Sequence, residues 1–150
     1  MTENIPALTV RQPWAHHLLT HPVRKDVENR TWYTPHRGQL AVHVALQVDP
    51  DGVASLAEPI TAEMDRDRGH IIGTLDVVDV HRDGSTDCAA WDCSGNPWAF
   101  HEVEFGPRVF HWRVENPRRL ITPIRARGRV GLWPAGPSVA HLLTIAEVHA

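Results

Sequence analysis

The segment "KDVENRTW", residues 25–32, places an amine, carboxylates, a guanidinium and an indole within eight positions. Side chains alternate along a strand, so Glu28, Arg30 and Trp32 share one face, and Lys25 at its start can reach back toward Glu28. A carboxylate between two cations stays ionised and accepts hydrogen bonds from an amino group such as that of cytosine. The two cations would bind phosphate or carbonyl oxygen. The alternative is a solvated strand edge, with surface ion pairs worth less than about 1 kcal/mol each.

The segment "VRQPW", residues 10–14, supplies three more candidate binding residues, Arg11, Gln12 and Trp14. It marks a change from strand to helix, where free backbone N–H groups favour an anion. Trp14 either stacks a base, an interaction worth about 1–3 kcal/mol, or fills the contact between helix and barrel as a core residue. Trp32 is the better stacking candidate because it faces with Glu28 and Arg30.

His43 and several arginines complete the set of candidate binding residues. In "QLAVHVA", residues 39–45, His43 lies on the strand face opposite the apolar residues. It either reaches the same cleft or is satisfied by a backbone carbonyl. Residues 108–129 contain seven Arg and a single acidic residue. The candidates for a phosphate-binding rim are Arg118, Arg119, Arg125, Arg127 and Arg129, and Arg37 is a further candidate for ligand binding.

Two cysteines and several histidines raise the question of a metal. Cys88, Cys93, His81 and His101 combine two thiols with two imidazoles, but their separations do not follow the compact spacing of a zinc finger. The chain also has no Gly-rich phosphate loop, no G-x-S-x-G and no H-E-x-x-H. We therefore predict no metal, no cofactor and no catalytic Ser or Cys.

The hydrophobic pattern predicts several short strands and few helices. Residues 50–67 read as one acidic amphipathic helix, and residues 82–107 as a long irregular connection. "HIIGTLDVVDV", residues 70–80, is apolar at nearly every position, which is typical of a strand covered on both faces. The other expected elements are a short helix over 13–21, strands over 26–32, 39–45, 109–116 and 129–133, a loop with a short strand over 117–128, and a terminal helix over 138–148.

Length and charge narrow the class of protein. A chain of 150 residues fits one domain, 1–150, around a single core. It has no apolar run that could span a bilayer and no signal-peptide pattern, so we expect a cytoplasmic protein that does not bind membranes. The net charge of −3 is uneven: residues 49–92 carry three basic and eleven acidic groups, and the flanking segments are net basic. A polyanion could therefore bind at one place.

The quoted segments, together with "GHIIGTLDVVDV" and "HWRVENPRRLITPIRARGRVGLW", resemble the ASCH domain, a branch of the PUA-like superfamily. The resemblance runs over about residues 7–134. It implies an α+β, mainly β fold: a PUA-like pseudo-barrel of five or six strands with flanking helices and a cleft beside the first helix. It also implies an association with RNA or nucleotide metabolism.

One branch of this family hydrolyses the acetyl amide of N4-acetylcytidine, and its catalytic Lys lies in a segment similar to "VRKDVENR", which points to Lys25. The catalytic Thr of that branch lies three residues later, where this chain has Glu28. In an enzyme of this kind Lys25 would activate water with help from Glu28. The pKa of Lys25 would then have to fall, whereas Glu28 raises it.

We therefore expect first a protein that binds RNA or a modified nucleotide or nucleoside in a cleft beside the barrel. The alternatives are an amidohydrolase acting on N4-acylated cytidine-type nucleosides and, with less support from the residues, a metal-dependent ribonuclease. The sequence gives no protein partner.

Overall fold

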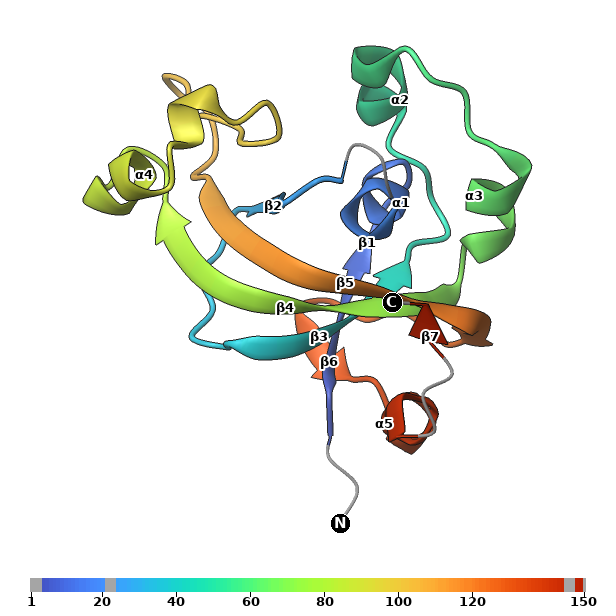
Figure 1. The fold of residues 1–150 in the computed structure, drawn as a ribbon. Helices are drawn as coiled ribbons and strands as arrows, with labels where there is room; N and C mark the ends of the chain where they lie inside the picture. Colours follow the sequence, from blue (N-terminus) through green and yellow to red (C-terminus); the bar gives the residue numbers. More distant parts are fainter. Residues whose placement is uncertain (1–3, 21–23, 145–147, 150) are drawn as a thin grey trace.

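The fold was obtained as a computed structural model, which describes residues 4–20, 24–144 and 148–149. A long curved sheet crosses the molecule, with α1 to α4 on one side and α5 on the other (Figure 1). In chain order the elements are β1 (Pro6–Val10), α1 (Trp14–Leu19), β2 (Val27–Arg30), β3 (Gly38–Val44), α2 (Pro50–Leu56), α3 (Ala62–Asp67), β4 (His70–Arg82), α4 (Thr86–Ala90), a 3-10 turn η1 (Cys93–Gly95), β5 (Phe110–Arg125), β6 (Leu132–Pro134), α5 (Pro137–Thr144) and β7 (Val148–His149).

The sheet has the strand order β2-β5-β4-β3-β1-β6, and β7 pairs with β5. β1 and β3 are parallel, and the other pairs are antiparallel. The parallel pair is possible because α1 and β2 lie between its strands in the sequence. This mixed, strongly curved sheet with flanking helices is the PUA-like fold that the sequence predicted.

Two apolar clusters cover the two faces of the central strands. Ile72 of β4 and Val42 of β3 belong to the cluster beneath α1, whereas Ile71 and Ala41 belong to the cluster that includes Val139 of α5. The predicted burial of β4 on both faces is therefore confirmed. Each fully buried Val, Leu or Ile contributes about 1.5–3 kcal/mol relative to an exposed one, so these clusters hold the sheet and its helices together.

Gly73 permits the closest approach between β4 and β5. It lies opposite Arg119 in the ladder, next to an irregularity in register. A Cβ atom at Gly73 would fall on the backbone carbonyl of Arg118 and within 2.7 Å of Leu19 Cδ1. A side chain at this position would therefore force apart two strands and the helix above them.

The prediction of one helix over residues 50–67 is wrong. The structure has two helices, because α2 ends at Ala57 in the left-handed conformation and Pro59 follows it. Each helix has its own start signal: the side chain of Asp49 accepts from Asp51 N, and that of Thr61 accepts from Met64 N.

The prediction of a strand over 109–116 followed by a separate loop and strand is also wrong, because β5 runs without a break to Arg125. Asn116 has a φ of +52°, and the register shifts so that Asn116 and Pro117 together oppose Leu75. This bulge accommodates a proline that cannot donate to the ladder.

The predicted terminal helix is shorter than expected. α5 ends at Thr144, and Val148, predicted as its last residue, lies in β7 beside Leu120. The predicted end of the first helix, at His21, lies outside the described residues. The predicted irregular connection 82–107 begins at Arg82, the last residue of β4, and after it contains α4, the turn η1 and no other helix or strand. No helix in the described part of the chain is long and apolar enough to cross a membrane.

Candidate ligand-binding cavity

A cavity of about 1270 Å³ opens where the ends of several elements meet beside α1. Its walls come from the ends of β1 and β3, the start of α1, strand β2, Phe100 and residues 125–130. These segments are far apart in the sequence, and the sheet order brings them together. Nine of the predicted site residues line the cavity: Arg11, Trp14, Lys25, Glu28, Arg30, His43, Arg125, Arg127 and Arg129.

A buried ionic triad forms one wall. Lys25 Nζ lies 2.8 Å from Glu28 Oε1, and Arg30 Nε lies 2.9 Å from Glu28 Oε2. Lys25 is 2% exposed and Glu28 is 6% exposed, so the surface-pair alternative does not describe this arrangement. Arg30 also donates to Thr9 O at 2.9 Å, which ties β2 to β1. Lys25 donates to Val27 O as well.

The triad shifts the pKa values of its members. Burial lowers the pKa of Lys25, although the charge of Glu28 opposes this effect. Burial by itself would raise the pKa of Glu28, but attraction and hydrogen bonds from Lys25 and Arg30 outweigh it, so the pKa is lowered. Glu28 is therefore ionised at neutral pH, with a cation on each side.

Trp14 forms the adjoining wall at the start of α1. Its Nε1 donates to Asp49 Oδ2 at 2.8 Å, and Lys25 Nζ lies 5.7 Å from the ring centroid. A Cβ atom on Gly52 would approach the indole to 2.9 Å, so α2 packs directly on the ring. Phe100 meets the ring edge-on with centroids 5.9 Å apart. These contacts fix the orientation of Trp14 beside the triad.

His43 borders the cavity, but its ring nitrogens already have partners. Nε2 donates to Ala126 O at 2.7 Å, so Nδ1 accepts from the hydroxyl of Thr9 at 3.1 Å. Burial lowers the pKa of His43, so the ring is neutral at physiological pH. A Cβ atom on Gly128 would lie 2.9 Å from its ring, which shows how closely the 126–130 segment covers His43.

The cavity is cationic although the whole chain carries −3. Seven of its lining residues are Lys or Arg, and two are Asp or Glu. Arg125, Arg127 and Arg129 are exposed and have no ion-pair partner among the described residues. This rim can attract and hold an anion.

The remaining five predicted site residues do not line this cavity. Gln12 is fully buried, where its amide accepts from His16 N and donates to Met64 O, linking α1 to α3. Trp32 packs edge-on against Trp112 in the core, with centroids 4.8 Å apart. β2 ends at Arg30, so the alternation of side chains along the strand does not extend to Trp32. For this reason Trp32 does not lie on the same side as the triad.

The other three are arginines outside the cavity. Arg37 donates to the carbonyls of Thr34 and His36, and Arg118 is exposed. Arg119 pairs with Asp67 and with Glu63, which joins β5 to α3.

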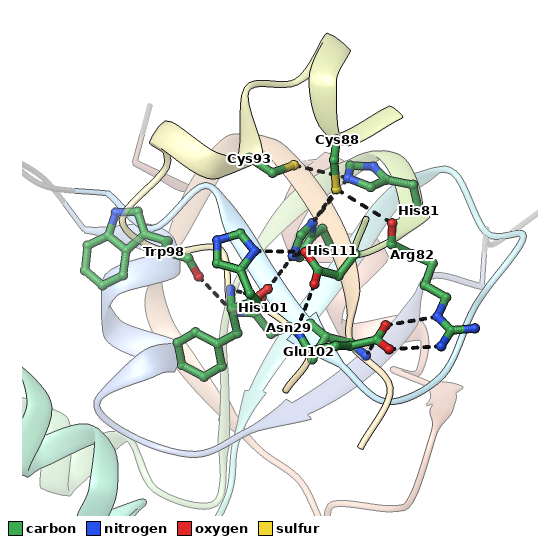
Figure 2. Close-up of polar contacts among 12 residues, drawn as sticks. Asn29, His81, Arg82, Cys88, Cys93, Trp98, His101, Glu102 and His111 are labelled. Carbon is green, nitrogen blue, oxygen red and sulfur yellow. Dashed lines mark hydrogen bonds and ion pairs between the residues drawn. The ribbon is translucent and has the colours of Figure 1, made fainter. Parts of the chain in front are cut away.

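The sequence did not single out Asp49, Asn29 and Phe100 as site residues. Asp49 had a local signal, because an Asp directly before Pro50 is typical of a helix start. Asn29 donates to Trp98 O at 2.8 Å and accepts from Phe100 N at 2.9 Å, which docks the irregular segment beside β2 (Figure 2). No pattern in the sequence indicates that contact, which joins residues about seventy positions apart.

The curved mixed sheet with a cavity beside its first helix places the chain among PUA-like proteins. The ASCH domain family model matches residues 8–123, and the chain belongs to this family. Activating signal cointegrator 1 from Homo sapiens is 35% identical over 81 residues, which are 48% of this chain but only 14% of the human protein.

Solved structures agree on the fold. The crystal structure of an ASCH protein from Zymomonas mobilis matches with a TM-score of 0.57 at 10% identity, over 97% of this chain and 96% of that chain. Two structures of variants of the same protein match with TM-scores of 0.55, at 10% and 9% identity and almost full coverage of both chains. At such identities the likeness concerns the fold alone.

Proposed function

We propose that this ASCH domain binds RNA or a modified nucleotide or nucleoside in the cavity beside α1. One cavity is lined by the Lys25–Glu28–Arg30 triad, by the fixed indole of Trp14 and by a cationic rim, and this observation carries the proposal. Burying the charges of Lys25 and Glu28 costs free energy that a purely structural contact between apolar residues would avoid. A binding role accounts for that cost.

The triad suits the edge of a base. Each oxygen of Glu28 accepts from one cation and has a further lone pair that can accept from an exocyclic amino group. Within the described chain, Val27 and Glu28 take two of the three N–H groups of Lys25, which leaves one for a carbonyl oxygen. An amino group beside a carbonyl is the pattern that cytosine presents.

Trp14 and the rim suit the rest of the ligand. The indole lies at the wall next to the triad, where a base bound to Glu28 could stack on it. Arg125, Arg127 and Arg129 stand at the opening, where phosphates would lie.

Fluorescence anisotropy with a labelled single-stranded RNA, measured over a range of salt concentrations, tests the proposal. Loss of two phosphate contacts in Arg127→Ala/Arg129→Ala should reduce the slope of log K against log salt by about 1.4. Arg37→Ala/Arg118→Ala removes the same number of charges outside the cavity and should leave the slope unchanged. An equal loss of slope in this control would mean that RNA is held by diffuse surface charge and not in the cavity.

A second candidate function has one specific observation in its favour. Burial lowers the pKa of Lys25, the direction that a neutral amine acting as a base requires, and Glu28 lies in contact with it. In an amidohydrolase, Lys25 would take a proton from water as the oxygen attacks the acyl carbonyl. The C–N bond would then break, and the proton would pass to the leaving amine, giving cytidine and a carboxylate.

Incubation with N4-acetylcytidine tests this alternative directly. Release of cytidine by the unmodified protein, lost in Lys25→Met and retained in Arg37→Ala, would support it. Absence of turnover, with nucleoside binding intact, would leave the binding function alone.

A further inference from the structure

Four side chains outside the cavity converge at the end of β4 (Figure 2). His81 of β4 and His111 of β5 are direct partners across the ladder, and Cys88 of α4 and Cys93 of η1 lie over them. Their ligand atoms all lie within 4.8 Å of one another. His111 is fully buried, as is Cys93, and His81 is nearly so.

Three of the six separations among these atoms are close to those of a tetrahedral metal centre. His81 Nε2 lies 3.2 Å from Cys93 Sγ and 3.2 Å from His111 Nδ1, and Cys88 Sγ lies 3.6 Å from His111 Nδ1. Zn–N bonds of about 2.0–2.1 Å and Zn–S bonds of about 2.3 Å place tetrahedral ligands about 3.3–3.8 Å apart. The observed separations lie at or close to this range.

The outer partners of both histidines fix where their lone pairs point. His81 Nδ1 lies 2.6 Å from Asp79 Oδ2, and His111 Nε2 lies 2.6 Å from Phe100 O. A carboxylate and a carbonyl can only accept, so the protons are on these outer nitrogens. Each inner nitrogen therefore directs a lone pair into the cluster, toward a thiol and the other ring, where a cation can be bound. Such outer hydrogen bonds are the usual support of metal-bound histidines.

The connection 82–107 contributes Cys93 and Ala99 to a small apolar cluster with Val27 of β2. A metal would supply the cross-links that this small cluster lacks.

We propose that His81, Cys88, Cys93 and His111 form a structural Cys2His2 site for a zinc ion. The site joins the ends of two strands to the 82–107 connection and so fixes the segment that presents Phe100 to the cavity. Three of these ligands were considered from the sequence together with His101, but the spacing H-x6-C-x4-C-x17-H is not that of a zinc finger, so zinc was not predicted. The fourth ligand is His111, brought in by strand pairing, whereas His101 bonds to Asp83.

Metal content and cobalt spectroscopy test this site. Chain purified without a histidine tag should contain one zinc per molecule by mass spectrometry. Its Co²⁺ form should show the intense visible bands of tetrahedral coordination and the near-ultraviolet absorption of thiolate bound to cobalt. Octahedral spectra, or no zinc uptake by reduced chain, would overturn the proposal.

Variants then assign the ligands. His111→Gln and Cys88→Ser should weaken zinc binding at least 100-fold, and Asp79→Asn about 10–100-fold, because it removes an outer partner. His101→Gln is the matched control, since this histidine lies next to the cluster, and it should leave affinity unchanged.

Should the ligand variants fail to fold, the spectra of the unmodified chain still decide the matter. Tight binding that persists in a Cys88→Ser/Cys93→Ser chain would assign the metal to other residues and refute the site. These readouts do not depend on RNA or nucleoside binding, so failure of the cavity's proposed function would leave them intact.

Discussion

Replacing Glu28 by Gln probes the buried triad most sharply. The substitution preserves the shape of the side chain and removes its charge, so Lys25 and Arg30 lose the anion between them. Lys25 cannot turn to solvent, because it is 2% exposed and also held by Val27 O. The variant therefore leaves the Lys25 amine buried without the carboxylate that stabilises its charge.

The structure sets the size of the effect. Breaking a buried ion pair by removing one partner costs about 3–5 kcal/mol. The Arg30 side chain is 23% exposed and can recover some hydration, so we expect the lower end, about 3 kcal/mol. For a chain of this length that loss lowers the melting temperature by roughly 6–12 °C.

Guanidinium chloride unfolding of Glu28→Gln measures this cost. Glu63→Gln is the matched control, because its pair with Arg119 spans 3.2 Å but its side chain is 51% exposed, and its loss should be below about 1 kcal/mol. Lys25→Met/Glu28→Gln should be less unstable than the sum of the two single variants. A Glu28→Gln chain as stable as the Glu63→Gln control would refute the account of a desolvated triad.

Three further predictions follow from the same structure. Because the pKa of Glu28 lies below its ordinary value near 4.5, the unfolded chain binds the extra proton first. The contribution of Glu28 to stability should be present above pH 4.5 and should fall as the pH drops through the pKa of Glu28 in the folded chain. This change should be absent from the pH profile of Glu28→Gln. Gly73→Ala should lower the free energy of unfolding by more than 2 kcal/mol, measured by thermal unfolding. Gly84→Ala should lower it by only about 1 kcal/mol, because its added methyl group meets only open space. Trp14→Ala should weaken RNA binding about 5–150-fold by titration, while Tyr33→Ala, exposed outside the cavity, should not; equal effects would rule out stacking on Trp14.

Local pattern determined most of the sheet. β3 and β4 are apolar on consecutive positions because both of their faces are covered, and that property is visible in the sequence. The pattern predicted the wrong boundaries where tertiary contacts decide how far an element extends. Asn116 and Pro117 are typical of the end of a strand, but they form a bulge opposite Leu75, and the strand pairing continues beyond them. In residues 50–67 the apolar period continued across Pro59, which hid the break between two helices.

For the cavity, the alternation of Glu28 and Arg30 was enough to place them together, because a strand fixes the direction of side chains two positions apart. The same reasoning placed Trp32 with them and did not hold, since β2 had already ended. Trp14 instead faces the hollow. Only the packing of α2 on its ring and the hydrogen bond that its Nε1 donates to Asp49 distinguish it from a core indole.

The sequence by itself therefore determined the sheet-forming segments, the ionic triad and the family, since these depend on neighbours a few positions apart. Tertiary structure decided which distant residues meet. The pairing of β4 with β5 sets His111 opposite His81, and the return of the 82–107 connection brings two thiols above them. No hydrophobic periodicity within a short segment predicts these contacts, because they depend on the register of strands about thirty residues apart and on the path of the chain between them.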